Sequence, residues 1–199
     1  MNQVIVLFSG GVDSTVLATE ALNQERLHSL LHFSYMQPAA LHEFSVASEW
    51  AHTNNVYLVR VIKQLYGTEA MNAESGEPGP RVIPGRNLIM LSLAINYAAS
   101  VGVKEVWYGP TRDDWEDYPD CRPEFVEQLC NLANEDVGVK VVAPLLQLTK
   151  KEVMARAIEL GVNIDETWSC YAPDPMTGEP CGSCNSCKLR EEAINGTGL

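Results

Sequence analysis

Basic residues are scarce in this chain. Its 199 residues include 14 Lys and Arg against 26 Asp and Glu, which gives a formal net charge of -12 at pH 7. A surface of that sign repels polyanions, so the composition argues against a broad surface for nucleic acid or for an anionic membrane. We therefore expect small-molecule partners, with no direct nucleic-acid partner and no membrane partner.

Long apolar runs are also missing. No stretch approaches the roughly 20 apolar residues of a membrane span, and Asn2 and Gln3 precede the first apolar run without the basic region of a secretory signal. These absences predict a cytoplasmic protein. With 199 residues and a hydrophobic fraction of 46%, the chain is long enough for one well-buried domain with a small appendage.

No lysine occurs between Met1 and Lys63, although a glycine-rich loop follows the first apolar run, Val4–Phe8. The two glycines permit a tight turn, and the N–H groups at the start of the next helix can hold phosphate oxygens. A Walker-type loop ends in Lys-Ser or Lys-Thr, so the missing lysine disfavours phosphoryl transfer by that route. We predict an ATP-using enzyme whose pyrophosphate-binding loop comprises Phe8, Ser9, Gly10, Gly11, Val12, Asp13, Ser14, Thr15, Val16, Leu17 and Ala18. The alternative is an ordinary strand-to-helix turn capped by Asp13 or Ser14.

Short apolar runs alternate along the chain with segments of helical periodicity. The expected strands are 3–8, 28–34, 56–62, 104–109 and 139–143, and the expected helices are 14–26, 39–53, 87–101, 123–137 and 150–160. Continuous hydrophobicity in the first strand is typical of a strand covered on both faces. The prediction is an α/β, Rossmann-like fold with a parallel five-stranded sheet and helices on both faces. Ligands of such sheets bind beyond the carboxyl ends of the strands.

Two further segments complete the predicted organisation. The stretch Gly67 to Pro84 is rich in glycine and proline and is expected to form a surface loop or lid over the ligand site. We expect residues 1–148 to form the ATP-binding domain and residues 149–199 a helical, cysteine-containing C-terminal segment. The final residues, 195–199, are expected to fray.

Four of the six cysteines crowd near the C-terminus with the spacing C-x10-C-x2-C-x2-C. Four thiolates at such spacing suit one tetrahedral, structural zinc ion held by Cys170, Cys181, Cys184 and Cys187. Such an ion would staple the C-terminal segment and would have no open position for water. An iron–sulfur cluster is the rival interpretation, although Lys188-Leu189 follows where a ferredoxin run has a further Cys-Pro. A third interpretation is that these cysteines form disulfides or remain free thiols.

A polar loop, Thr111 to Arg122, follows the fourth expected strand and should lie beside the phosphate loop. Carboxylates can accept hydrogen bonds from the ring N–H and amino groups of a flat heterocycle, and Trp115 or Tyr118 offers a stacking face. Arginines can contact anions bidentately. The candidate catalytic residues are Asp13, Arg86, Asp114, Asp120 and Arg122. Arg86 and Arg122 are candidate anion contacts, and the alternative for Arg86 is a surface residue at a helix start. The alternative is a solvated acidic loop in which Asp120 caps the next helix.

Five motifs occurring in order resemble the QueC family of 7-cyano-7-deazaguanine synthases, a branch of the PP-loop ATP pyrophosphatases. They are Ser9 to Thr15, Pro84-Gly85-Arg86-Asn87, Tyr118 to Phe125, Glu166 to Tyr171 and the three closing cysteines. The resemblance implies a fold of the adenine nucleotide α-hydrolase type and a homodimer. It also implies a ligase that uses ATP and Mg²⁺ to join ammonia to 7-carboxy-7-deazaguanine, forming the nitrile through adenylated carboxylate and amide intermediates in queuosine biosynthesis.

This chain departs from the family pattern at two loops. After the second expected strand the family shows Tyr-Gly-Gln-Arg-His and then an acid. This chain has Tyr35-Met36-Gln37-Pro38-Ala39 there, and Glu43 is displaced from the position of that acid. In the second loop, Glu116-Asp117 replace a Ser-Gly pair. A ligase that stops at 7-amido-7-deazaguanine is therefore an alternative. Two others are a PP-loop enzyme acting on intact tRNA, which the acidic composition disfavours, and a non-catalytic nucleotide-binding zinc module.

Overall fold

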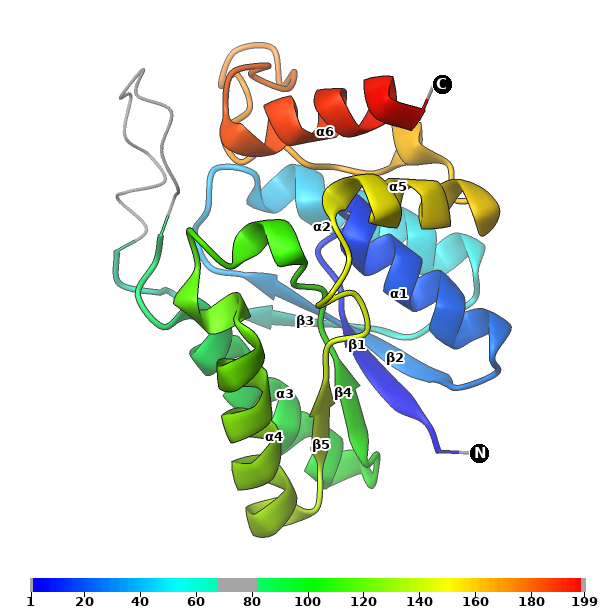
Figure 1. The fold of residues 1–199 in the computed structure, drawn as a ribbon, viewed down its shortest axis with the longest axis vertical. Helices are drawn as coiled ribbons and strands as arrows, with labels where there is room; N and C mark the ends of the chain where they lie inside the picture. Colours follow the sequence, from blue (N-terminus) through cyan, green and yellow to red (C-terminus); the bar gives the residue numbers. More distant parts are fainter. Residues whose placement is uncertain (1, 68–81, 198–199) are drawn as a thin grey trace.

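The computed structural model describes residues 2–67 and 82–197 of the chain. Its centre is a five-stranded sheet with the order β3-β2-β1-β4-β5, and every neighbouring pair is parallel (Figure 1). The strands are β1 (Val4–Leu7), β2 (Leu27–Ser34), β3 (Leu58–Ile62), β4 (Glu105–Trp107) and β5 (Lys140–Val142). The predicted parallel five-stranded sheet is confirmed. Most of the predicted lid, residues 68–81, lies outside the described residues.

Helices cover both faces of this sheet (Figure 1). They are α1 (Val12–Asn23), α2 (Ala40–Thr53), α3 (Arg86–Val101), α4 (Pro123–Val137), α5 (Lys150–Glu159) and α6 (Asn185–Thr197). Successive residues of β1 serve opposite faces, because Val4 and Val6 pack with α1, α2 and α5 whereas Ile5 packs with α3 and α4. This two-sided burial explains the unbroken hydrophobicity of β1.

The strand order reverses at β1, which pairs with β2 on one side and with β4 on the other. The chain leaves β1 for β2 and β3 and returns through α3 to β4, so the two halves of the sheet diverge there. In open α/β sheets this switch point opens a crevice beyond the carboxyl ends of the strands. The loop Phe8 to Gly11 leaves β1 at that crevice.

Helix α6 was not predicted. It begins at Asn185, inside the cysteine motif, and ends at Thr197, so it includes residues 195–197 of the stretch that was expected to fray. It packs on α5 (Figure 1), and Ala193 joins the same core cluster as α1 and α5. The predicted division into residues 1–148 and 149–199 stays a prediction.

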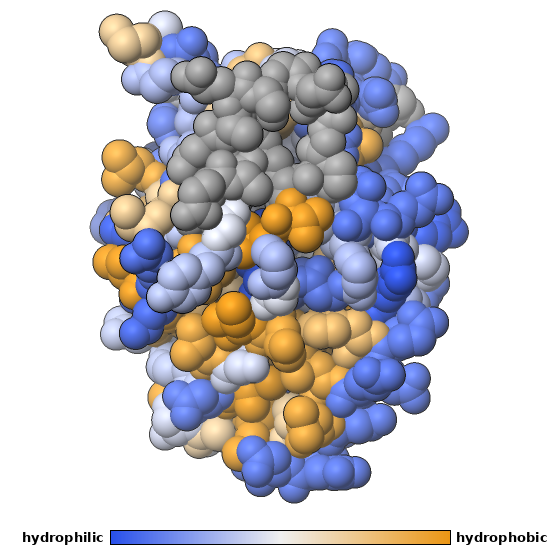
Figure 2. Space-filling view, turned by 90° about the vertical axis from the view of Figure 1, so that its left-hand side faces the viewer, coloured by the Kyte–Doolittle hydropathy of each residue, from blue (hydrophilic) through white to orange (hydrophobic). Residues whose placement is uncertain are grey.

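Apolar side chains are distributed unevenly over the surface of the molecule. Figure 2 shows apolar side chains gathered over the lower half of one face, beside a polar region. The exposed apolar side chains of α3 are Leu88, Ile89 and Val101. Within the described ranges, no helix combines the length and the apolar composition that crossing a bilayer requires.

Candidate active site

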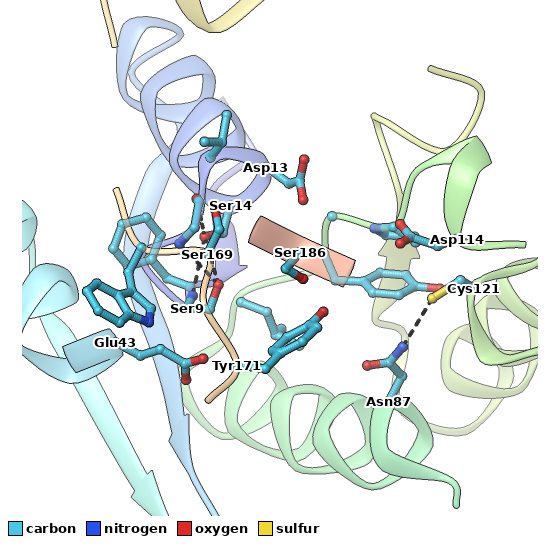
Figure 3. A pocket seen from close by; sticks show the side chains of 18 of the residues that line it. Ser9, Asp13, Ser14, Glu43, Asn87, Asp114, Cys121, Ser169, Tyr171 and Ser186 are labelled. Atoms are coloured by element: carbon cyan, nitrogen blue, oxygen red, sulfur yellow. Dashed lines mark hydrogen bonds between the residues drawn. The ribbon is translucent and has the colours of Figure 1, made fainter. Parts of the chain in front are cut away.

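A cavity of 290 Å³ lies beyond the carboxyl end of β1, bordered by the glycine-rich loop, α3 and α6 (Figure 3). Its polar lining residues are Ser9, Asp13, Ser14, Tyr35, Glu43, Arg86, Asn87, Tyr108, Asp114, Tyr118, Cys121, Lys150, Trp168, Ser169, Tyr171, Asn185, Ser186 and Arg190. In Figure 3, Glu43 and Asp114 lie on opposite sides of the view, with Tyr171 and Ser186 between them and with Ser9 and Ser14 on the side of Glu43. The cavity thus joins the predicted phosphate loop to a polar chamber.

The glycine-rich loop is shaped by close packing. Gly10 has a φ of +86°, and a Cβ built there would lie 2.9 Å from Val46 Cγ1, so only glycine fits. The Ser14 hydroxyl donates to the Gly11 carbonyl at 3.0 Å, and Ser14 Oγ accepts from the N–H of Ser9 at 3.3 Å. These bonds hold the first turn of α1 open towards the cavity, where its N–H groups suit an anion.

The residues predicted for the phosphate loop divide into three groups. Those that line the cavity are Phe8, Ser9, Gly11, Val12, Asp13 and Ser14. Gly10 and Thr15 shape the turn, since Thr15 Oγ1 donates to the Gly11 carbonyl. Val16, Leu17 and Ala18 are fully buried in the core.

A lysine reaches this loop from a distant part of the chain. Lys150 Nζ lies 2.6 Å from Asp13 Oδ2 and 3.7 Å from Asp114 Oδ2. Its backbone N–H donates to Asp113 at 2.7 Å, and the preceding Thr149 forms a capping box with Glu152 that fixes the first turn of α5. Burial acts to lower the pKa of Lys150, but Asp13 and Asp114 outweigh it and raise that pKa, so the side chain is cationic at neutral pH.

Lys150 is not among the site residues that the sequence predicted. The pattern Thr149-Lys150-Lys151-Glu152 signals a helix start, but nothing local connects it to a loop 137 residues earlier. The cation that is absent from the glycine-rich loop is therefore supplied by α5.

A second polar group lines the opposite side of the cavity. Arg86 Nη1 lies 3.4 Å from the Tyr35 hydroxyl, and the Gln37 amide donates to Glu43 Oε2 at 2.8 Å. Burial raises the pKa of Glu43 and raises that of Tyr35 to about 12. Glu43, which the sequence showed only as a displaced family position, is thus a cavity carboxylate near Arg86 and Tyr35.

The acidic loop contributes unequally to the cavity. Asp114 lines it and also accepts hydrogen bonds from Thr111 N–H and Oγ1, each at 2.8 Å. Asp120 instead accepts from the N–H of Asn87 at 3.0 Å, at the start of α3. Arg122 is exposed and donates from Nε to the Trp115 carbonyl at 2.8 Å. The structure therefore brings Asp13, Arg86 and Asp114 to the cavity but not Asp120 or Arg122.

Cys121 also lines the cavity. The Asn87 amide lies 3.4 Å from Cys121 Sγ, and burial raises the pKa of this thiol to about 12. The side chain is therefore a neutral thiol at physiological pH and a poor nucleophile.

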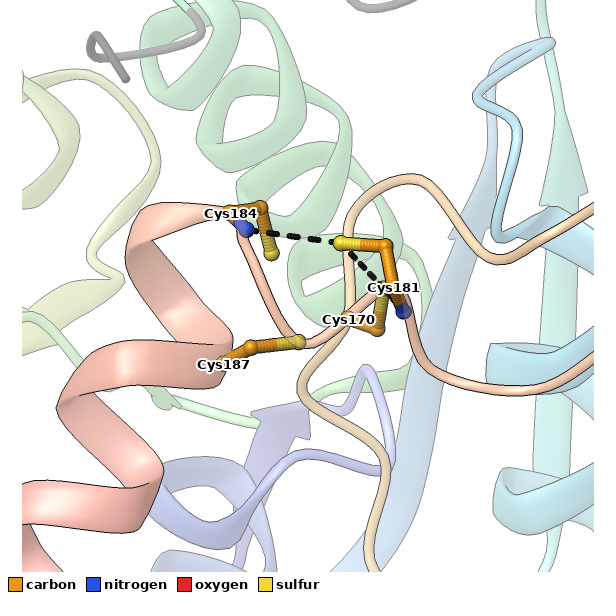
Figure 4. A group of neighbouring side chains, drawn as sticks. All are labelled: Cys170, Cys181, Cys184 and Cys187. Atoms are coloured by element: carbon orange, nitrogen blue, oxygen red, sulfur yellow. Dashed lines mark hydrogen bonds between the residues drawn. The ribbon is translucent and has the colours of Figure 1, made fainter. Parts of the chain in front are cut away.

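The four C-terminal cysteines converge on one point (Figure 4). Their sulfur atoms all lie within 4.8 Å of one another, and those of Cys170 and Cys181 are 3.5 Å apart. Four sulfurs at about 2.3 Å from one zinc ion would be separated by about 3.8 Å, whereas a disulfide requires about 2.05 Å. The donor set and its spacing fit a tetrahedral metal site.

This cysteine cluster adjoins the cavity. Ser169 and Tyr171 flank Cys170, and Asn185 and Ser186 lie between Cys184 and Cys187; all four of these neighbours line the cavity. The metal site and the chamber therefore share one wall.

Comparison with known proteins gives consistent matches. The family model described as "Queuosine biosynthesis protein QueC" matches residues 3–198. "7-cyano-7-deazaguanine synthase 1" from Colwellia psychrerythraea is 35% identical over 209 residues, covering 97% of this chain and 94% of the relative. The "7-cyano-7-deazaguanine synthase" from Marinobacter nauticus is 33% identical, covering 100% of this chain and 95% of the relative.

One similar solved structure is NMN synthetase from Francisella tularensis. Its TM-score is 0.58 at 17% identity, covering 98% of this chain and 77% of that chain. At this level of identity the likeness shows a shared fold.

Proposed function

Since this chain belongs to the QueC family of queuosine biosynthesis proteins, we propose that it converts 7-carboxy-7-deazaguanine and ammonia to 7-cyano-7-deazaguanine with ATP. It is a ligase that forms carbon–nitrogen bonds. The match over residues 3–198 carries this proposal. A glycine-rich loop and a lysine at one polar cavity support it, because ATP needs both backbone donors and a cation at its phosphates.

The phosphates of ATP are assigned to the start of α1 and to Lys150, which lies beside the phosphate loop. The backbone N–H groups at the start of α1 would hold phosphate oxygens, and Lys150 would neutralise charge on the departing pyrophosphate. Asp13 and Asp114 are oxygen donors of the kind that Mg²⁺ prefers, and they are the residues that would hold it. Mg²⁺, when bound, supplies further charge neutralisation at the phosphates.

The chemistry requires two activations. The substrate carboxylate attacks the α-phosphorus of ATP, pyrophosphate leaves and an acyl adenylate forms. Ammonia then attacks the carbonyl carbon, and AMP leaves to give the amide. The amide oxygen then attacks the α-phosphorus of a second ATP, and a second pyrophosphate leaves. Loss of AMP and of the two nitrogen-bound protons yields the nitrile. Each nitrile therefore costs two ATP molecules.

The deazaguanine is assigned to the chamber between Glu43 and Arg86. A carboxylate can accept two hydrogen bonds from the adjacent ring N–H and amino group of a guanine-like edge, which adenine does not offer. Tyr171 and Tyr118 supply aromatic surface for the flat ring. Among the remaining candidates, Asp114 contacts the reacting end, Asp120 positions Asn87, and we assign Arg122 to the outer loop.

One zinc ion per chain is the proposed occupant of the four cysteines. The absence of an open coordination position would make this ion structural. Metal analysis of purified protein tests this: zinc near one equivalent is expected, whereas iron with acid-labile sulfide would establish the iron–sulfur alternative.

The family also suggests a setting and an assembly. We propose a cytoplasmic enzyme, because ATP and reduced thiols are both available there. A homodimer is proposed from the family resemblance. The exposed apolar side chains of α3, Leu88, Ile89 and Val101, are proposed as contacts, since exposed apolar side chains are candidates for burial at an interface. Light scattering after gel filtration would contradict this by showing a monomer.

Substrate-dependent release of pyrophosphate tests the proposed function. Purified protein is incubated with ATP, Mg²⁺ and ammonium, with and without 7-carboxy-7-deazaguanine; guanine replaces the acid as a control. Pyrophosphate and AMP should form only with the acid. Tight ATP binding without turnover would support the non-catalytic alternative and overturn the ligase.

A further inference from the structure

One segment, residues 164–170, joins the cysteine cluster to the phosphate loop. The N–H of Trp168 donates to the Gly10 carbonyl at 2.9 Å. The Trp168 carbonyl lies 3.2 Å from a Cβ built on Gly11, so this residue borders both glycines. Cys170 follows two residues later in the same segment. A shift of this segment would therefore move a wall of the phosphate loop.

Arg190 of α6 holds the same segment in place. Its Nη1 donates to Thr167 Oγ1 at 2.8 Å, to the Thr167 carbonyl at 3.2 Å and to Ser169 Oγ at 3.2 Å. Its Nη2 donates to the Ile164 carbonyl at 2.5 Å. A planar guanidinium presents five N–H donors in a fixed fork, whereas a lysine ammonium offers three donors from a single atom. Residues 164–169 are thus attached to α6 through one side chain.

The cysteines provide a second connection between α6 and the segment that contains Cys170. Cys170 lies in the segment, whereas Cys187 lies on α6 one turn before Arg190. A metal ion bound by both would fix α6 relative to the segment, and Arg190 would extend that fixed geometry to Thr167 and Trp168. The contacts then run without a gap from the metal ligands to Gly10.

We propose that Arg190 is a positioning residue that couples the four-cysteine metal site to the phosphate loop, so that metal occupancy sets the affinity for ATP. The inference rests on the proposed function for its ligand and its metal. It assigns to the metal site a second role in the binding of nucleotide, beyond stapling the C-terminal segment.

The test compares Arg190→Met with Arg190→Lys, and Lys188→Met serves as the matched control because Lys188 is an exposed cation on the same helix. Metal content is measured by atomic emission, and the Kd for ATP with Mg²⁺ by calorimetry. Arg190→Met should keep its metal and weaken ATP binding about tenfold or more, since charged hydrogen bonds are lost. The Kd of Arg190→Lys for ATP should lie between those of Arg190→Met and the parent, and the Kd of Lys188→Met should equal that of the parent.

The coupling between the metal site and ATP binding is measured by removing the metal. Chelation should weaken ATP binding in the parent but have little further effect in Arg190→Met, because the connection is already broken. Equal effects of chelation in both proteins, or an unchanged Kd in Arg190→Met, would overturn the proposal. If Arg190→Met does not fold, Thr167→Val removes one acceptor of Arg190 and should weaken ATP binding in the same direction. Failure of the parent itself to bind ATP would instead contradict the proposed function.

Discussion

In the proposed function, Lys150 supplies the cation at the phosphates of ATP. The loop contains no cation of its own, and the Lys150 ammonium is held 2.6 Å from Asp13. A cation placed at developing phosphate charge accounts for a large part of catalysis in such sites.

Lys150→Met is therefore expected to lower kcat by about 10²-fold or more. Steady-state release of pyrophosphate measures this, and Lys151→Met is the control because Lys151 is an adjacent, exposed lysine. Equal activity of Lys150→Met and Lys151→Met would remove Lys150 from the mechanism.

Glu43 is the residue on which substrate selection depends in this account. Glu43→Gln keeps the shape and an acceptor for Gln37 but loses the second acceptor for a guanine-like edge. KM for 7-carboxy-7-deazaguanine should rise about tenfold, with KM for ATP little changed. The exposed Glu49→Gln on the same helix is the control. A rise confined to KM for ATP would show that Glu43 faces the nucleotide.

The same substitution should change the pH dependence of stability. Burial raises the pKa of Glu43 in the folded state above 4.5, so folding favours the protonated form. That stabilisation is fully present below the unfolded pKa and is lost as pH rises through the folded pKa. Glu43→Gln should therefore have a higher Tm than the parent at pH 8, and the gap should close towards pH 4.5. A gap that is constant with pH would contradict the burial of a charged carboxylate.

The site residues easiest to predict from the sequence are those that share one local motif. Ser9 to Ser14 were predictable because a strand, two glycines and a helix start lie within one short stretch. Lys150 and Asp13 are 137 residues apart, and their contact depends on how α5 crosses the sheet. The position of Glu43 depends in the same way on the displaced loop after β2.

At the scale of elements, α3 begins without a capping side chain of its own. Its N-cap is Gly85, in the left-handed region, and the Asp120 carboxylate accepts from the N–H of Asn87 instead. A substitution at Asp120 therefore acts through the start of α3, which also carries Arg86.

Asp120→Asn should retain nearly full activity, because its amide oxygen can still accept, whereas Asp120→Ala should lose about 1 kcal/mol of folding free energy. Urea denaturation and steady-state kinetics measure both. If Asp120→Asn abolished turnover while its stability was kept, the charge of Asp120 would be needed in catalysis, as the sequence analysis expected.

The strands and the first five helices were predictable because their apolar periodicity is strong. Helix α6 was not, since its first turn consists of polar residues and one cysteine, Cys187, and its core contacts come from Ala193 and Ile194. Its place in the structure follows from the cysteine ligands and from packing on α5, and neither is a local signal.

At the scale of the whole molecule, the cysteine cluster joins the end of the chain to the core. Cys184→Ser leaves three ligands and should loosen α6, because binding of a structural metal is coupled to folding. Its Tm should fall by about 5 °C or more, and Cys130→Ser, outside the cluster, is the control. An unchanged Tm together with unchanged metal content would show that the cluster does not hold a structural ion.

The acidic composition and the polyanionic ligand are compatible at this scale. A net charge of -12 repels ATP over the surface as a whole, whereas Lys150, Arg86 and the start of α1 place positive charge and donors inside one cavity. Composition alone excluded broad polyanion surfaces but could not reveal this local arrangement, which arises only when distant segments fold together.

The most direct test of the central claim is the ratio of AMP to product when the protein turns over 7-carboxy-7-deazaguanine, ATP, Mg²⁺ and ¹⁵N-ammonium, followed by mass spectrometry. We expect 7-cyano-7-deazaguanine that carries one ¹⁵N, with two AMP formed per nitrile. One AMP per molecule of accumulated amide would contradict the second activation, and no AMP dependent on the acid would contradict the ligase itself.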